Sequence, residues 1–166
     1  MIFLTVGTTK FPFNRLLKAV DCALLDLDKK EKLIAQIGES RYNFRYKNAE
    51  IFKEISFDKM IFYFEKGRVI IAHGGLGTIS LALKFGKNKP LIVPRSKRFK
   101  EHVDDQQIFL AEFFKKKGLI ETVLPEESLK EEVAHYIKSP DKPAKKARPS
   151  SLEKMIKQLI DYTEGI

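Results

Sequence analysis

The sequence predicts an α/β protein with a Rossmann-like, doubly wound parallel sheet, in which helices cover both faces. Short apolar runs alternate along the chain with longer segments whose apolar residues recur at helical spacing. The strand runs are apolar at successive positions, as in strands buried on both faces. The best-marked unit is 69–80, where the run Val69–Ala72 stops at a glycine cluster and a helical pattern follows.

The expected elements follow this alternation from end to end. Strands are predicted at 1–6, 33–37, 69–72, 90–93 and 120–123, and helices at 12–27, 58–65, 77–86, 103–117 and 126–137. Pro12 suits a first helical position, Asp58 is expected to cap the second helix, and Gly67 to end it. Segment 41–56 mixes aromatic and charged residues and is left open, with one or two short strands as the alternatives.

Composition places the chain among soluble, single-domain proteins. Its 166 residues are 43% hydrophobic and 32% charged, no run approaches the roughly 20 apolar residues of a membrane span, and no signal peptide precedes the first strand. A cytoplasmic protein is therefore expected. The single cysteine, Cys22, excludes an internal disulfide and a cysteine zinc cage, whereas the net charge of +9 favours an anionic partner.

Three segments are distinguished. Residues 1–137 are expected to form the folded domain, 138–149 a basic, proline-containing linker, and 150–166 an amphipathic helix. That helix carries one apolar stripe, which either folds back on the domain or docks on a partner.

The glycine cluster after the third strand predicts a phosphate site. Glycines 74, 75 and 77 allow close approach of the backbone, and the following helix offers free N–H groups and the positive end of its dipole. Thr78 adds a hydroxyl, and His73 can donate to an oxyanion or orient a sugar. A purely structural turn is the alternative.

Two common nucleotide motifs are excluded. Ser80 stands where the dinucleotide fingerprint needs a third glycine, no acid follows the strand 90–93, and no Gly-Lys-Ser/Thr closes the loop. Loops at Gly7, His73 and Pro94 all follow strands, so they are expected at one edge of a parallel sheet, where ligands bind.

With these loops in place, the chain resembles the glycosyltransferase family 28 C-terminal domain group, the donor-binding half of GT-B glycosyltransferases. It is similar to small stand-alone members, the PssE-like subunits of exopolysaccharide synthesis and the soluble subunit of the dolichol-linked N-acetylglucosaminyltransferase. The resemblance rests on four ordered segments, which are 2–16 with its Val-Gly-Thr turn, 73–79, 86–95 and 101–107.

The resemblance implies a UDP-sugar donor and assigns roles to residues. It implies diphosphate contacts from the glycine loop and Arg95, sugar or ribose contacts at the start of the later helix, and a first loop lining the same cleft. The diphosphate residues are Gly74, Gly75, Gly77, Thr78 and Arg95; the sugar and ribose residues are Glu101, Asp105, Gln106 and Gln107; the first-loop residues are Gly7, Thr8 and Thr9. His73 and His102 are the candidate bases.

The resemblance also implies a partner. One Rossmann-like domain is half of a GT-B enzyme, so we expect a membrane-anchored subunit to present a lipid-linked sugar acceptor and to hold this chain at the membrane surface. Transfer of a hexose is expected to need no metal ion or other cofactor, because a helix N-terminus and basic side chains can help the diphosphate to leave.

Two other functions remain as alternatives. Thr9 stands where these subunits commonly carry a histidine, which makes a non-catalytic accessory subunit the second choice. A basic nucleic-acid-binding protein is the third, and we do not expect nucleic acid as a partner because aromatic-interleaved basic strands and known motifs are missing from the sequence.

Overall fold

The computed structural model describes residues 1–27, 30–125 and 127–140, with the single residues 154 and 157. Within this part of the chain, six strands form one sheet in the order β3-β2-β1-β4-β5-β6, and every neighbouring pair is parallel. The strands are β1 (Ile2–Thr5), β2 (Leu33–Gln36), β3 (Ala49–Phe52), β4 (Val69–His73), β5 (Leu91–Val93) and β6 (Glu121–Thr122). The predicted doubly wound α/β sheet is confirmed.

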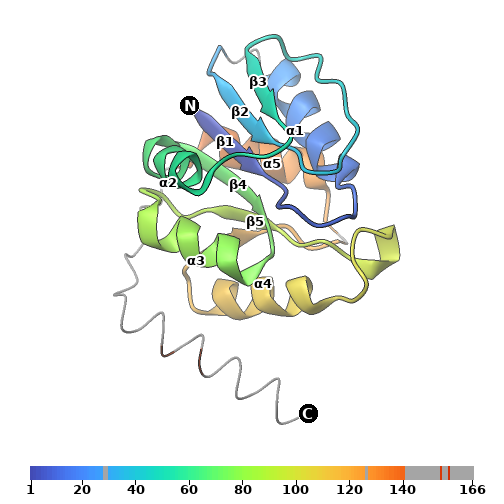
Figure 1. Cartoon of the computed structure of the whole chain (residues 1–166), viewed down its shortest axis with the longest axis vertical. Coiled ribbons are helices and arrows are strands. Elements are labelled where there is room, and N and C mark those ends of the chain that lie inside the picture. The colour runs from blue at the N-terminus through green and yellow to red at the C-terminus, as the bar shows by residue number, and fades with distance from the viewer. Residues whose placement is uncertain (28–29, 126, 141–153, 155–156, 158–166) are drawn as a thin grey trace.

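Helices cover both faces of the sheet (Figure 1). One face carries α1 (Asn14–Asp26) and α5 (Leu129–Lys138), whose apolar residues share a cluster with the strands. The other carries α2 (Phe57–Lys66), α3 (Leu76–Phe85) and α4 (Gln106–Lys116). A single 3₁₀ turn, η1 (Lys97–Phe99), lies in the loop between β5 and α4.

Burial of both faces of the sheet explains why the strands are continuous apolar runs in the sequence. Successive side chains of a strand point to opposite faces, and here both faces are covered. In β1, Ile2 and Leu4 pack with α1 and α5, whereas Phe3 packs with α2 and α3; all three side chains are fully buried. A strand with polar residues at every second position would leave one helix layer without its apolar contacts.

All five helices begin at other residues than predicted; α1 starts at Asn14, so Pro12 lies before it, and α5 starts at Leu129. Side-chain hydrogen bonds explain the starts of α2 and α4. Ser56, not Asp58, caps α2, and its side chain accepts a hydrogen bond from the Lys59 amide. Helix α4 begins at Gln106, later than predicted, because Asp104 accepts the Gln106 amide and turns the chain just before the helix. Short polar side chains form such turns with nearby amides more readily than they extend a helix.

The open segment 41–56 is an irregular stretch followed by β3. A buried carboxylate, Asp21 of α1, holds the irregular part by accepting the Tyr42 hydroxyl at 2.8 Å and the Tyr46 amide at 2.9 Å. These bonds lower the pKa of Asp21 against the opposing effect of burial. Local sequence contains no sign of this contact, because its partners are more than 20 residues apart.

The predicted linker 138–149 and helix 150–166 lie almost entirely outside the described residues, and α5 continues to Lys138. No helix in the described part of the chain is long and apolar enough to cross a membrane.

The strand order places a topological switch between β1 and β4. From β1 the chain moves outward to β2 and β3, then returns to the other side of β1 as β4 and continues to β5 and β6. In open α/β sheets, ligands bind beyond the carboxyl ends of the strands at this point. The loops after β1 and β4 are therefore the place to look for a site.

Candidate functional site

The loop after β1 is held by one buried amide side chain. Gln36 accepts the Gly7 amide at 3.1 Å and donates to the Gly7 carbonyl at 2.9 Å, and it also accepts the Thr5 hydroxyl. Gly7 has a φ of +75°, which favours glycine. Beyond it Thr8 is exposed, and the Thr9 hydroxyl accepts the Phe11 amide. The first loop thus has a fixed start and a local turn.

His73 ends β4 and fills the space between two loops. A Cβ built on Gly7 would lie 2.6 Å from Cε1 of His73, and one built on Gly75 would lie 2.5 Å from Nε2. The side chain is 7% exposed, and its Nδ1 has no hydrogen-bond partner among the described residues. Burial, followed by the nearby Arg95 charge, lowers the pKa of His73 to about 4. The imidazole is therefore neutral at pH 7 and a weak base.

The N-terminus of α3 offers free backbone donors beside this imidazole. Its cap residue is Gly75, without a side-chain cap, and the first amide to bond back along the chain is that of Ile79. The amides of Leu76, Gly77 and Thr78 have no acceptor in the part of the chain that the structure describes. Space above Gly77 is open, with no atom within 4 Å of a built Cβ. Orphan amides at the positive end of a helix are suited to binding an anion.

Gly74 does not belong to this set of free donors. Its amide donates to Oε1 of Gln107 at 3.0 Å, and a Cβ at position 74 would lie 2.9 Å from Cβ of Gln107. The Gly74 amide is therefore not free for the expected diphosphate contact, whereas the sugar or ribose contact expected of Gln107 stays a prediction, because its two bonds to backbone amides engage only its Oε1. The physical reason is packing, since α4 approaches the strand end so closely that its glutamine replaces solvent.

Arg95 also differs from its expected role as a phosphate ligand. The side chain is fully buried, where it donates to the carbonyls of Val6 at 2.7 Å and Phe11 at 2.8 Å and stacks on the Phe13 ring. Burial lowers the pKa of Arg95 to about 10. Its guanidinium is occupied by protein carbonyls, so it joins the first loop to the loop after β5.

Glu101, expected at the donor sugar, is likewise occupied. Both its oxygens accept from Arg15 at 2.9 Å, and one also accepts the Ser96 amide. The Glu101 side chain is 6% exposed. This carboxylate pairs the start of α1 with the loop after β5, which leaves it no free oxygen aimed at solvent.

Asp105, Gln106 and His102 remain accessible. Asp105 accepts the Ser96 hydroxyl and the Lys97 amide through one oxygen, and Gln106 is exposed at the first position of α4. The His102 Nδ1 lies 2.9 Å from Asp104, and its ring lies near Phe11 of the first loop. These three residues face solvent at the same edge as the α3 N-terminus.

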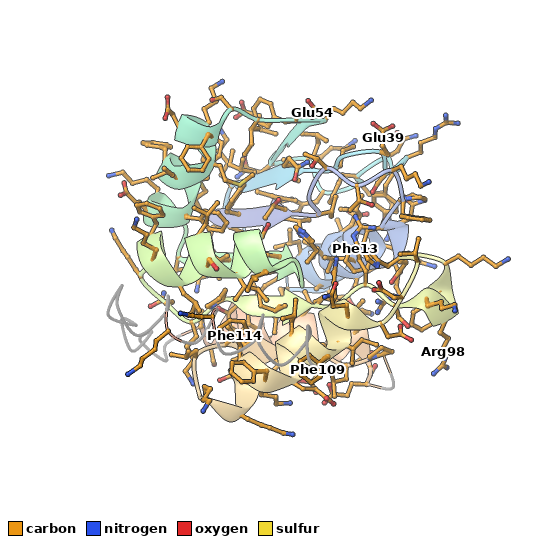
Figure 2. The ribbon with its side chains drawn as sticks, turned by 60° about the horizontal axis from the view of Figure 1, so that its bottom comes forward. Phe13, Glu39, Glu54, Arg98, Phe109 and Phe114 are labelled. Atoms are coloured by element: carbon orange, nitrogen blue, oxygen red, sulfur yellow. The ribbon has the colours of Figure 1, made fainter. Side chains whose placement is uncertain are left out.

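The basic side chains after β5 point in two directions. Figure 2 shows Arg98 at the outer tip of this loop, pointing away from the body of the protein, and Lys97 and Lys100 are exposed beside it. Arg95, three residues earlier, points inward. Among the described residues, no group of three or more His, Cys, Asp or Glu side chains could hold a metal ion.

The structure thus brings the predicted loops together but redistributes their roles. The sequence did not identify roles for Gln36 and Arg15, which anchor the first loop and Glu101. A polar glutamine closing an apolar strand was the available sign for Gln36. Arg15 lies on a helix surface, and the sequence contained no sign of its role.

The family model described as glycosyltransferase family 28 C-terminal domain matches residues 1–160. The chain belongs to this family. No curated protein sequence matches this chain.

Solved structures with the same fold include GT-B glycosyltransferases. The glycotransferase of kitacinnamycin superposes with a TM-score of 0.62 at 16% identity, covering 92% of this chain and 36% of that one. The calicheamicin glycosyltransferase CalG4 gives 0.59 at 16% identity, covering 92% and 35%. Glycosyltransferase VinC, solved in complex with dTDP, gives 0.52 at 18% identity, covering 84% and 33%. The family 28 domain spans about a third of the length of these neighbours and has the fold of the GT-B donor half.

Proposed function

We propose that this family 28 domain binds the nucleoside diphosphate of a UDP-sugar and supplies the donor half of a two-component hexosyltransferase. The observation that carries the proposal is the uncapped N-terminus of α3 beside the neutral, buried His73, at the switch point of the sheet. VinC, which has the same fold, was solved with a nucleoside diphosphate, and this supports the ligand class.

The chemistry fits these groups. In glycosyl transfer the bond from the anomeric carbon to the diphosphate breaks, the acceptor oxygen bonds to that carbon, and the acceptor proton passes to a base. The free amides of Leu76, Gly77 and Thr78 can accept the negative charge that grows on the diphosphate. His73 is too weak a base at pH 7 to take the acceptor proton, so we assign it to orienting the diphosphate. His102 remains the candidate base on this chain.

The acceptor side is proposed to come from a second, membrane-anchored subunit that presents a lipid-linked sugar. The family 28 domain covers only about a third of its structural neighbours, and its net charge of +9 suits an anionic surface. In this arrangement the domain is held at the membrane surface by its partner. Co-purification with a candidate acceptor subunit, followed by transfer from labelled UDP-sugar to lipid, tests this part.

The donor site has a sharp test at Gly77. Gly77→Asp fits the open space and places a carboxylate in the first turn of α3, where it favours the helix dipole by about 0.3–1 kcal/mol. The same carboxylate opposes a diphosphate. We expect unchanged or higher stability with UDP affinity reduced by about tenfold or more, a cost of about 1.4 kcal/mol.

Gly77→Asn, of similar shape and without charge, is the matched control. Calorimetric titration with UDP, UDP-sugars and dTDP measures the affinity of each protein. If UDP does not bind the wild-type domain, or binds Gly77→Asp and Gly77→Asn equally well, the donor site is elsewhere. Salt-sensitive binding of RNA in preference to UDP would favour the nucleic-acid alternative.

A non-catalytic accessory subunit is the second candidate. It is favoured by the engagement of Arg95, Glu101 and Gln107 inside the domain, where they are committed to protein groups. Transfer by the assembled complex discriminates the two functions, because Gly77→Asp should reduce transfer by a catalytic donor half about tenfold or more when the UDP-sugar is below saturation, and should leave transfer intact in an accessory subunit.

A further inference from the structure

Two loops lie side by side at the carboxyl edge of the sheet, and we call the face formed by residues 10–11 and 97–103 the loop surface. The first of these segments follows β1, and the second follows β5 and contains η1. The rings of Phe11 and His102 lie 6.2 Å apart, which joins the two segments. The loop surface therefore combines side chains that are far apart in the sequence.

Apolar side chains are exposed on the loop surface. Val103 is 62% exposed and belongs to none of the three apolar clusters of the core, and Phe99 is 36% exposed. Phe11 is half-buried beside them. Covering such side chains is favourable, because apolar area is then removed from water. This face is suited to a contact outside the domain.

Basic side chains surround these apolar residues. The Lys10 Nζ lies 5.5 Å from the centre of the Phe11 ring, and the Arg98 guanidinium lies 5.2 Å from that of Phe99. Arg98 points away from the body of the protein (Figure 2). Cations and apolar groups thus alternate across both loops. The exposed basic residues of the loop surface are Lys10, Lys97, Arg98 and Lys100.

Acidic side chains of the same loops do not cancel this charge. Glu101 is 6% exposed and is paired with Arg15, and Asp105 accepts the Ser96 hydroxyl at 3.0 Å. Asp104 lies 2.9 Å from Nδ1 of His102. The loop surface is therefore basic, and charge complementarity indicates an anionic partner.

We propose that the loop surface rests on an anionic lipid bilayer, with Val103 and Phe99 among the headgroups and the basic side chains against lipid phosphates. This goes beyond the proposed function, in which a partner subunit holds the domain at the membrane. Lysine is depleted at protein–protein interfaces, whereas its apolar stem and charged end suit the headgroup region. The contact turns the carboxyl edge, with the α3 N-terminus, toward the bilayer.

Vesicle binding by the full chain, without any partner, tests the proposal. We expect it to float with vesicles of equal parts phosphatidylcholine and phosphatidylglycerol, less so as salt is raised, and not with phosphatidylcholine alone. A chain that does not float with the anionic vesicles overturns the proposal. Calorimetric titration with UDP on the same preparation judges the donor site separately, because lipid contact does not depend on UDP binding.

A tryptophan at position 103 reports which part of the chain meets the lipid. The sequence contains no tryptophan, so Val103→Trp introduces a single reporter. We expect its emission to shift to the blue with the anionic vesicles and to be quenched by brominated lipid. Phe62→Trp, at a position of α2 that is 51% exposed, is the matched control and should keep the emission of an indole in water. No shift at position 103, or a shift at position 62 alone, overturns the proposal.

Two double substitutions of equal net charge separate position from total charge. Lys10→Glu with Lys97→Glu changes one lysine in each loop, whereas Lys47→Glu with Lys87→Glu changes two exposed lysines at the amino edge of the sheet. A basic side chain near an anionic bilayer contributes about fivefold in affinity, so the first pair should weaken binding by about 25-fold or more. The second pair should change it far less, since its lysines lie away from the lipid. Equal losses contradict the assignment to the loop surface.

Other occupants of this surface give different results. A second copy of the chain would appear in light scattering as a dimer that Val103→Ser dissociates. RNA would appear as binding to poly(U) that exceeds vesicle binding and is lost in the Lys10→Glu, Lys97→Glu pair. Either result overturns the lipid assignment. Circular dichroism checks that each variant is folded, as expected for substitutions at exposed positions.

Discussion

His73 and Gly75 fit together so closely that a Cβ on the glycine would lie 2.5 Å from Nε2 of the histidine. The imidazole cannot turn away, because Gly7 lies against it on another side and the ring is buried. The contact links the loop after β1 to the loop after β4. It makes the side chain of His73 part of the wall that shapes the proposed diphosphate site.

The close fit of His73 and Gly75 predicts that alanine substitutions at Gly75 and Gly77 change the stability of the fold in opposite directions. Gly75→Ala should lower the free energy of unfolding by about 1–3 kcal/mol, because the buried ring must move. Gly77→Ala should raise it by about 0.5–1 kcal/mol, since position 77 is helical and its built Cβ meets no atom within 4 Å. Urea unfolding of both variants measures the difference, and equal stabilities would contradict the fit.

The low pKa of His73 predicts a pH dependence of stability. The folded protein holds this imidazole neutral down to about pH 4, whereas the unfolded chain protonates it near pH 6.5. Between these values the unfolded state binds more protons, so stability is full above pH 6.5 and falls as the pH is lowered. The loss from this group is about 3 kcal/mol by pH 4.

Urea unfolding at a series of pH values tests this linkage against His73→Asn, which cannot titrate. The variant should lose the part of the slope that lies between pH 4.5 and 6.5. Two-dimensional NMR of the imidazole provides a direct check. Observation of a charged His73 at pH 6 would contradict the buried neutral state.

The contacts of Arg15 and Glu101 predict that these two side chains stabilise each other and that Glu101 does not contact the donor. Their bidentate pair is largely shielded from solvent, with side chains 23% and 6% exposed. Arg15→Gln and Glu101→Gln should each destabilise the fold, and a double-mutant cycle should return a coupling of about 1–3 kcal/mol. Both single variants should then change UDP-sugar affinity alike. A loss of sugar affinity confined to Glu101→Gln would return Glu101 to the donor site.

Donor binding is predicted to be independent of divalent metal ions, because backbone amides at the start of α3 supply the positive potential. Titrations with UDP in the presence of EDTA and of magnesium should give the same affinity. Transfer by an assembled complex should likewise continue in chelator. Strict dependence on magnesium in either measurement would contradict this prediction.

Much of the fold could be predicted because its signals are local. The apolar runs of β1, β2 and β4 indicated strands buried on both faces, and glycines indicated where the chain turns. The limits of α2 and α4 were less predictable, since Ser56 and Asp104 compete with neighbouring residues for the same few amides. Strand β3 was obscured because its side chains are half exposed at the edge of the sheet.

The position of the candidate site could be predicted from the sequence, but the roles of several of its residues could not. Alternation of strands and helices puts the loops at Gly7, His73 and Arg95 at one edge, whatever their side chains do. Which polar groups then face a ligand depends on partners far along the chain. Arg95 meets Val6 across 89 positions and Arg15 meets Glu101 across 86, and no local pattern encodes such pairs.

The amino-acid sequence by itself determined the parallel sheet, the glycine loop and the helix that begins there, because burial and backbone freedom act over a few residues. Tertiary structure decided that Arg95, Glu101 and Gln107 turn inward, while the amides of Leu76, Gly77 and Thr78 stay free. The reason is that a buried polar group must find a hydrogen-bond partner, and only the packed fold determines whether that partner is the protein or a ligand.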